Sequence, residues 1–285
     1  MGRFSRQILL FGDEGQQVLS NIRVAIIGLG GLGSHVSQQL AYLGIRKFGL
    51  VDGDMVEETN LNRLIGATAD DVPASRPKVD VAERMIKAVD PEVQVERVGK
   101  SFISLEGRAL LSEADFVIGC VDNDGARLAL TAVCAALHKP YMDVATDIDP
   151  DDTPINYGGR IIFAKGASGC CHCLGALDDR EIERWMGSED QLAADDRIYG
   201  SGAAGPSPSV VCLNGVLASA ACLEFMVEVT GLREANRWLE YDGPSGKMRV
   251  DSTVPTGWCP YCESFKYGST EYVDWMLSRL PQTHR

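Results

Sequence analysis

A glycine-rich turn between a buried strand and a helix is the feature that most constrains this fold. Residues 23–28 (RVAIIG) form a short apolar run rich in β-branched residues, which predicts a buried strand. The turn that follows matches G-x-G-x-x-G, with Gly28, Gly30 and Gly33 at the fixed positions and Gly31 between them. The apolar segment after the turn predicts a helix. A strand, a glycine turn and a helix in this order predict a cradle for a phosphate group.

The first half of the chain alternates between short apolar strands and helical patterns. This alternation predicts an α/β fold with a doubly wound, mostly parallel sheet of the Rossmann type. Beyond residue 147 an acidic, proline-containing stretch predicts a solvated turn, and residues 157–164 predict a longer strand that is antiparallel. The predicted parallel strands are 23–28, 48–52, 93–98, 115–120 and 140–145, and the predicted helices are 34–44, 75–89 and 123–139.

The second half of the chain predicts fewer regular elements. Residues from about 174 to 207 contain few apolar residues and predict a long crossover loop with a short helix at 180–186. Residues 208–231 predict an apolar helix, which we expect to be buried in the core. Two short strands predict an antiparallel C-terminal extension. We expect one domain over residues 1–265 and a tail over 266–285; the short strands are 237–242 and 247–251, and the tail helix is 269–280.

Composition excludes several classes of function. The chain has 285 residues, 45% of them hydrophobic, and a formal net charge of −13. An acidic protein is repelled by nucleic acid and by anionic membranes, so we expect neither as a partner. The sequence shows neither a secretory signal nor an apolar run of the roughly 20 residues that a membrane helix needs. We therefore expect a cytoplasmic protein.

Polar side chains collect just after the second predicted strand. Asp52 ends that strand, where a carboxylate is placed to accept hydrogen bonds from ribose hydroxyls. Together with the glycine turn, Asp52 predicts a ligand that contains adenosine, although these features alone do not separate NAD from ATP. Further candidate ligands of the nucleotide follow at the same edge of the sheet: Asp54, Asn60, Asn62 and Arg63.

Two cations and an acidic stretch favour ATP over NAD. Arg63 and Lys78 are placed to clamp a triphosphate, and a nicotinamide enzyme has no need of two cations there. Asp122, Asn123 and Asp124 follow the predicted strand that ends at residue 120, where an exposed carboxylate suits Mg²⁺ and Asn123 is a further candidate ligand of the nucleotide. A purely structural role stays open, because Asp122 equally suits the cap of the helix that follows.

Four of the nine cysteines form two CxxC pairs, Cys170 with Cys173 and Cys259 with Cys262. Four thiolates in two such pairs suit a tetrahedral zinc ion. With four sulfur ligands the metal keeps no open position, so we predict a structural zinc knuckle that ties the start of the crossover loop to the C-terminal tail. Spacing favours these four residues over two alternative ligands inside the first pair, Cys171 and His172.

The order of these motifs resembles the ThiF/MoeB/HesA family, whose fold is ancestral to that of ubiquitin-activating enzymes. The resemblance covers about Arg3 to Cys262 and rests on R-F-S-R-Q, G-L-G-G-L-G, V-D-G-D, N-L-N-R, P-K-V, C-V-D-N and the two CxxC pairs. It implies an adenylyltransferase that uses Mg-ATP to adenylate the C-terminal glycine of a small ubiquitin-like or sulfur-carrier protein and releases pyrophosphate.

The resemblance also assigns roles to individual positions. Arg6 would be an arginine finger that reaches the ATP of the partner protomer, which implies a homodimer. Both reactants are anionic, so catalysis needs positioning and charge neutralisation rather than a general base. The other implied roles are ribose binding by Asp52, phosphate binding by Asn60, Arg63 and Lys78, and Mg²⁺ binding by Asp122.

Two departures from the family pattern qualify this prediction. Many relatives carry a cysteine in the crossover loop, whereas this chain has none between Cys173 and Cys212, and we expect Cys212 to be buried in the apolar helix. We therefore predict adenylation without an enzyme-bound thioester. Leu64 stands where the family usually has glutamine, so one polar contact to ATP would be missing.

Several alternative functions stay open. In the same class, the chain would be an activating enzyme that passes its protein on as a thioester in a bacterial ubiquitin-like conjugation system, or a relative that modifies peptides or tRNA. In other classes, it would be an NAD-dependent oxidoreductase or a non-catalytic binding scaffold. The paired cations and the zinc knuckle disfavour the oxidoreductase, and the acidic charge disfavours tRNA.

Overall fold

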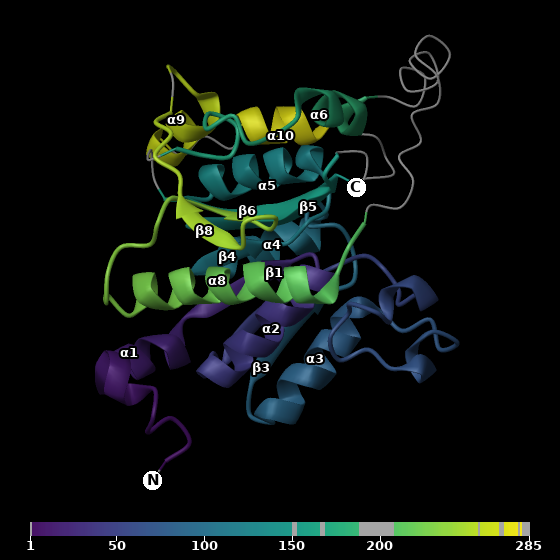
Figure 1. The fold of residues 1–285 in the computed structure, drawn as a ribbon, viewed down its shortest axis with the longest axis vertical. Helices are drawn as coiled ribbons and strands as arrows, with labels where there is room; N and C mark the ends of the chain where they lie inside the picture. Colours follow the sequence, from purple (N-terminus) through teal and green to yellow (C-terminus); the bar gives the residue numbers. More distant parts are fainter. Residues whose placement is uncertain are drawn as a thin grey trace.

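An eight-stranded sheet in the order β3-β2-β1-β4-β5-β6-β7-β8 organises the molecule (Figure 1). The computed structural model describes residues 2–149, 153–165, 169–187, 208–255, 257–267, 271–278 and 280. Neighbouring strands from β3 to β5 are parallel, and those from β5 to β8 are antiparallel. The predicted α/β class, with a parallel sheet and an antiparallel extension, is confirmed.

The central strands are apolar on both faces because helices cover both sides of the sheet. All four residues of β4 are buried, as are the last four of β1 and of β2. The strands are β1 (Arg23–Ile27), β2 (Lys47–Val51), β3 (Gln94–Val98), β4 (Phe116–Gly119), β5 (Tyr141–Asp149), β6 (Asn156–Ala164), β7 (Trp238–Asp242) and β8 (Lys247–Val250).

Two layers of helices enclose the sheet (Figure 1). Buried residues of α1, α2, α3 and α8 form one apolar cluster with the sheet, and those of α4 and α5 form the other. The outer helices α6, α9 and α10 pack against α5. The helices are α1 (Ile8–Asn21), α2 (Gly31–Leu43), α3 (Lys78–Val89), α4 (Leu105–Glu113), α5 (Asp124–Ala136), α6 (Asp179–Met186), α8 (Val211–Val229), α9 (Pro260–Tyr267) and α10 (Glu271–Ser278).

Helix α8 is a core helix, as its composition predicts. Contrary to the expectation that no apolar run is long enough for a membrane span, α8 has that length and apolar character, yet more than half of that window is buried inside the protein, against α2 and the sheet. The expectation that Cys212 is buried is wrong: its side chain is exposed. Helical periodicity explains the difference, because Cys212 begins a stripe on the outer face of α8 that continues with Val216, Ser219 and Leu223.

Some local expectations also need correction. The acidic residues 147–149 are not a solvated turn but the last residues of β5, where Asp149 pairs with Asn156 of β6. Three of the described α-helices were not predicted, α1, α4 and α9; α1 carries Gly12 at φ 74°, which bends it. The predicted short helix at 180–186 is confirmed as α6, whereas residues 188–207 of the predicted crossover loop lie outside the described residues.

Candidate nucleotide site and metal centre

The turn after β1 lies between the loops that follow β2 and β4. Gly28 has φ 85°, and its backbone N–H donates to the carbonyl of Val51 at the end of β2 (2.9 Å). On its other side, a Cβ at Gly28 would come within 2.7 Å of the Cys120 carbonyl oxygen. The carboxyl ends of β2, β1 and β4 therefore meet at this turn, which is where ligands bind in open α/β sheets.

The glycines of the turn have different surroundings. A Cβ at Gly33 would lie 1.9 Å from the Gly28 carbonyl oxygen, so Gly33 is needed for close packing of α2 on the turn. At Gly31 a Cβ would meet the side chains of Asn214 and Arg63. Around Gly30, by contrast, nothing lies within 4 Å of the added Cβ. Gly30 thus faces the open side of the turn, at the start of α2, where free N–H groups and the helix dipole attract an anion.

Asp52 is held by the turn itself. Its carboxylate accepts hydrogen bonds from the backbone N–H of Leu29 (2.6 Å) and of Asp54 (2.8 Å), one at each oxygen. Burial raises the pKa of Asp52, and the nearby charge of Lys78 partly offsets that rise. Each oxygen can accept a further hydrogen bond, so the fixed carboxylate suits a ribose hydroxyl.

Lys78 lies at the same edge of the sheet, at the first residue of α3. Its ammonium group is paired with Asp54 (Nζ to Oδ2, 2.7 Å), and its backbone N–H donates to the Asp54 carbonyl. The Lys78 side chain is only 12% exposed, whereas that of Asp54 is 72% exposed. Asp54, a predicted nucleotide ligand, therefore holds Lys78 here, and a phosphate group would have to compete with an exposed, screened partner.

Arg63 lies on the segment that connects Asp54 to α3. Its guanidinium donates to the Thr59 carbonyl and to the Asn62 side chain (3.1 Å), and a Cβ on Gly31 would lie 3.5 Å from its Cδ atom. The structure thus brings Arg63 beside the glycine turn. A hydrogen bond from Ile65 N–H to the hydroxyl of Ser34 fastens the same segment to α2.

Two other residues of this segment have structural contacts. Asn60 accepts a hydrogen bond from the backbone N–H of Glu57 (3.1 Å) and so caps the short helix Glu58–Asn60. Leu64 is buried in a small apolar cluster with Val56 and Val81. Leu64 therefore packs inside the segment rather than presenting a group to the nucleotide.

An ion cluster around the buried carboxylate of Asp71 fixes the rest of the segment, and nothing in the sequence singled it out. Asp71 is 1% exposed and accepts hydrogen bonds from both terminal nitrogens of Arg84, from Arg76 and from Thr68. The guanidinium of Arg84 lowers the pKa of Asp71 well below its usual range. Because Arg84 belongs to α3, the cluster ties the segment to the helix that begins with Lys78.

Asp122 is exposed just beyond β4. It lies two residues after Cys120, the residue whose backbone lies against Gly28. The helix cap is supplied by Asn123, whose side-chain oxygen accepts from the N–H of Ala126 (2.7 Å). The cap interpretation of Asp122 is therefore wrong, and its carboxylate faces solvent beside the turn. The structure gives Asn123, a predicted nucleotide ligand, this capping role.

A buried arginine stabilises the loop that contains Asp122. Arg127 donates to the Val121 carbonyl and forms an ion pair with the fully buried Asp143 (2.8 Å). Its Nε atom also lies 3.2 Å from Asp124. The loop is thus anchored to both α5 and β5.

Arg6 lies far from this site within its own chain. Its neighbour Gln7 donates to the Leu43 carbonyl (2.7 Å), at the C-terminal end of α2, whereas the glycine turn is at the other end. A helix of 13 residues spans about 20 Å. Arg6 is exposed, so the predicted finger would have to act on another chain.

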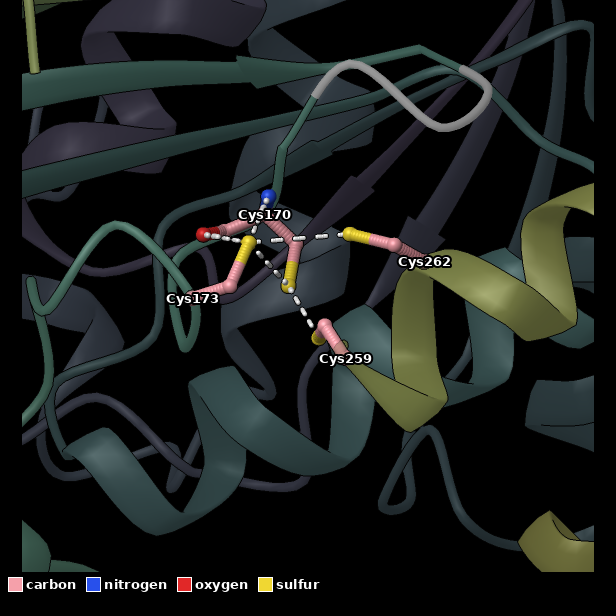
Figure 2. Close-up of side chains that lie close together, drawn as sticks. All are labelled: Cys170, Cys173, Cys259 and Cys262. Atoms are coloured by element: carbon pink, nitrogen blue, oxygen red, sulfur yellow. Dashed lines mark hydrogen bonds between the residues drawn. The ribbon is translucent and has the colours of Figure 1, made fainter. Parts of the chain in front are cut away.

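The four predicted cysteines of the zinc knuckle come together between the end of β6 and α9 (Figure 2). Sulfur–sulfur distances are 3.8 Å for Cys170–Cys173, 3.7 Å for Cys170–Cys259 and 3.6 Å for Cys173–Cys262. A tetrahedron of thiolates at a zinc–sulfur distance of about 2.3 Å has edges of about 3.8 Å, so the cluster fits zinc.

The surroundings of the cysteine cluster also suit a metal. The backbone N–H of Cys170 points to the sulfur of Cys173 (3.2 Å), a contact that stabilises a thiolate. Of the alternative ligands, Cys171 is buried in the core, where desolvation raises its pKa, and the His172 ring packs edge-on against Tyr261. The cluster would pin the segment before α6 to the C-terminal helices.

Comparisons with known proteins show the family and the fold of the chain. The model of the ThiF family matches residues 4–256. The sulfur carrier protein ThiS adenylyltransferase of Escherichia coli K12 is 29% identical over 265 residues, which covers 91% of this chain and 94% of that protein. The molybdopterin-synthase adenylyltransferase of the same strain is 37% identical over 181 residues, covering 62% of this chain and 69% of that protein.

Among solved structures, E. coli MccB with succinimide superposes with a TM-score of 0.71 at 22% sequence identity. The match covers 92% of this chain and 74% of MccB. At this level of identity the similarity shows a shared fold.

Replacement of Gly30 by alanine should weaken nucleotide binding without disturbing the fold. The added methyl group meets no protein atom within 4 Å, but it occupies the open side of the turn. We expect the Kd for ATP to rise on the order of tenfold or more, because one methyl group keeps a phosphate from the backbone N–H groups. Isothermal titration would measure binding, and thermal unfolding would check the fold; unchanged affinity would place the phosphate elsewhere.

Acid should destabilise the nucleotide-site segment through Asp71. Its folded pKa is lowered, so its ion pairs stabilise the protein above the unfolded pKa, about 3.9, and are lost as the pH falls below that value. Asp71→Asn should be less stable at neutral pH and should lose less stability on acidification than the wild type. Urea unfolding between neutral pH and pH about 3 measures this difference, with the exposed neighbour Asp70→Asn as control. Identical pH profiles would contradict the assignment.

The purified protein should contain about one zinc ion per chain. Cys259→Ser removes one of four ligands and should cost both metal content and thermal stability, since the site links distant segments. Elemental analysis and thermal unfolding measure the two effects. Cys212→Ser, outside the cluster, is the matched control and should change neither. Full stability of the Cys259 variant without zinc would show that the cluster needs no metal.

Proposed function

Because the chain belongs to the ThiF family, we propose that it is an adenylyltransferase that activates the C-terminal glycine of a small ubiquitin-like or sulfur-carrier protein. The observation that carries this proposal is the convergence of a glycine turn, a fixed carboxylate and two cations at the carboxyl edge of the sheet. The near full-length similarity to an enzyme that adenylates the carrier ThiS supports the choice of substrate class.

In the proposed reaction, a carboxylate oxygen of the carrier forms a bond to the α-phosphorus of ATP. The bond between that phosphorus and the bridging oxygen breaks, and pyrophosphate leaves with the electron pair. Nucleophile and leaving group are both anions, so no proton has to be moved. Catalysis depends on orientation and on neutralising charge in the transition state.

The chain supplies these functions from separate elements. Backbone N–H groups at the start of α2 bind phosphate oxygens, and Asp52 orients the ribose. Arg63 and Lys78 neutralise charge that builds up on the triphosphate. Asp122 would hold Mg²⁺, which would neutralise charge on the leaving pyrophosphate.

We further propose that the active unit is a homodimer. Arg6 supports a dimer because it is remote from the nucleotide site of its own chain and so could act only at the site of another chain. Leu9 and Leu10 beside it on α1 are 86% and 60% exposed, and the outer stripe of α8 presents Val216 and Leu223. Burying these side chains against a second copy would favour association and bring Arg6 toward the partner's nucleotide.

A second candidate function is transfer of the activated protein to an enzyme cysteine. It is favoured by the exposure of Cys212 in the first turn of α8. Thiols deeper in the chain are poor acceptors, since burial raises the pKa of Cys222 to about 12 and those of Cys120 and Cys134 still higher. We expect adenylation to proceed without a thioester: the wild type should form no thiol-sensitive bond to the carrier, and Cys212→Ser should keep full pyrophosphate exchange.

Asp122→Ala should abolish adenylation and leave the fold intact, because the side chain is exposed and makes no contact that supports the core. ATP–pyrophosphate exchange with a carrier protein measures activity, and thermal unfolding measures stability. Glu92→Ala, an exposed carboxylate in the turn before β3, is the control and should behave like the wild type. Normal turnover of the Asp122 variant would overturn the assignment of Mg²⁺.

Mixing two inactive variants tests the dimer. Arg6→Ala and Asp122→Ala should each be inactive alone, because each lacks one part of every site. After subunit exchange, half of the dimers are mixed and each has one intact site, so about a quarter of wild-type activity should return. Failure to recover activity, with exchange verified, would show that Arg6 does not act across an interface.

A further inference from the structure

The side chain of Asn214 is a buried polar group that none of these roles uses. It lies in the first turn of α8 and is 1% exposed. Its Nδ2 atom donates to the hydroxyl of Ser209 (3.1 Å), and its Oδ1 atom accepts from the hydroxyl of Thr146 on β5 (3.3 Å). An amide in the interior is costly unless it is hydrogen-bonded, so these two partners fix where it sits.

This amide touches the glycine turn at one residue. A Cβ on Gly31 would lie 2.2 Å from Nδ2 of Asn214, which is closer than the two atoms can approach, and 3.2 Å from Cγ, which is a tight contact. Gly31 therefore makes room for a side chain of α8. The other glycines of α2 and the turn differ, because Gly30 faces open space and Gly33 packs against a backbone carbonyl.

Gly31 is the first residue of α2, so its position sets the N–H groups that face a phosphate. Asn214 packs against that residue while its two hydrogen bonds hold it to β5 and to Ser209, just before α8. The glycine turn, β5 and the entry to α8 are thus joined by one side chain. Charge stabilisation at such a site depends on placing donors before the ligand arrives.

We propose that Asn214 is a positioning residue for the nucleotide: by filling the space over Gly31, it holds the first turn of α2 in the geometry that receives the phosphates. The proposal rests on nucleotide binding at this turn, as in the proposed function. Asn214 acts through the backbone of Gly31 and need not touch ATP.

A double-mutant cycle tests this role in the full-length protein. Asn214→Ala releases the turn and should raise the Kd for ATP on the order of tenfold, with a much smaller effect on kcat for pyrophosphate exchange. Gly31→Ala should also weaken ATP binding, because its methyl group collides with the Asn214 amide. The double variant should bind ATP no worse than Asn214→Ala alone, because the collision is gone.

Gly33→Ala combined with Asn214→Ala is the matched control. The Gly33 methyl group collides with the Gly28 carbonyl, so removing the Asn214 amide should give no relief. Thermal unfolding of every variant separates a general loss of stability from the specific loss of affinity.

The outcomes separate this proposal from the proposed function. Absence of ATP binding by the wild type would contradict the proposed function. If the wild type binds ATP but the effects of Gly31→Ala and Asn214→Ala on the Kd are additive, the positioning role of Asn214 is contradicted and the proposed function is not. A cycle that is non-additive at Gly31 and additive at Gly33 would support it.

Discussion

The close contact between Gly28 and the backbone of Cys120 is the constraint on which the rest of the site depends. It brings the turn after β1 against the loop after β4, and only a residue without a side chain, at positive φ, fits there. From this contact follow the start of α2, the hydrogen bond that fixes Asp52, and the position of Asp122 two residues beyond Cys120. The contact between Gly28 and Cys120 therefore fixes the positions of a phosphate cradle, a ribose ligand and a candidate Mg²⁺ ligand.

The positive charge at the nucleotide site comes from the segment between β2 and α3, which has stabilising contacts of its own. Lys78 begins α3 and Arg63 lies beside the turn, while the ion cluster at Asp71 ties the segment between them to α3. Lys78 is paired with the exposed Asp54, whose charge solvent screens, and Arg63 donates to uncharged acceptors, so a triphosphate can compete for both cations. This division suits a reaction between two anions, where a fixed cradle orients the nucleotide and cations neutralise charge as pyrophosphate leaves.

The features that could be predicted from the sequence are those that depend on local patterns of residues. The strands, the glycine turn and the two CxxC pairs depend on short spacings, and the cysteines do meet in one cluster. Features created by tertiary packing were invisible. Asp71 is one of many acidic residues until Arg84 approaches it from α3, and the exposure of Cys212 depends on which side of α8 faces the sheet. Likewise, Gly31 lies within a phosphate motif, but the side chain that it packs against is some 180 residues away in the sequence.

The most direct test of the central claim is ATP–pyrophosphate exchange with a small carrier protein that ends in glycine. Adenylation of the carrier predicts exchange that requires both Mg²⁺ and the free C-terminal carboxylate, with the carrier's mass rising by one adenylyl group. Amidation of that carboxylate should abolish exchange and leave ATP binding unchanged. Exchange that persists with the amidated carrier, or ATP binding with no exchange for any protein ending in glycine, would contradict the proposed activity.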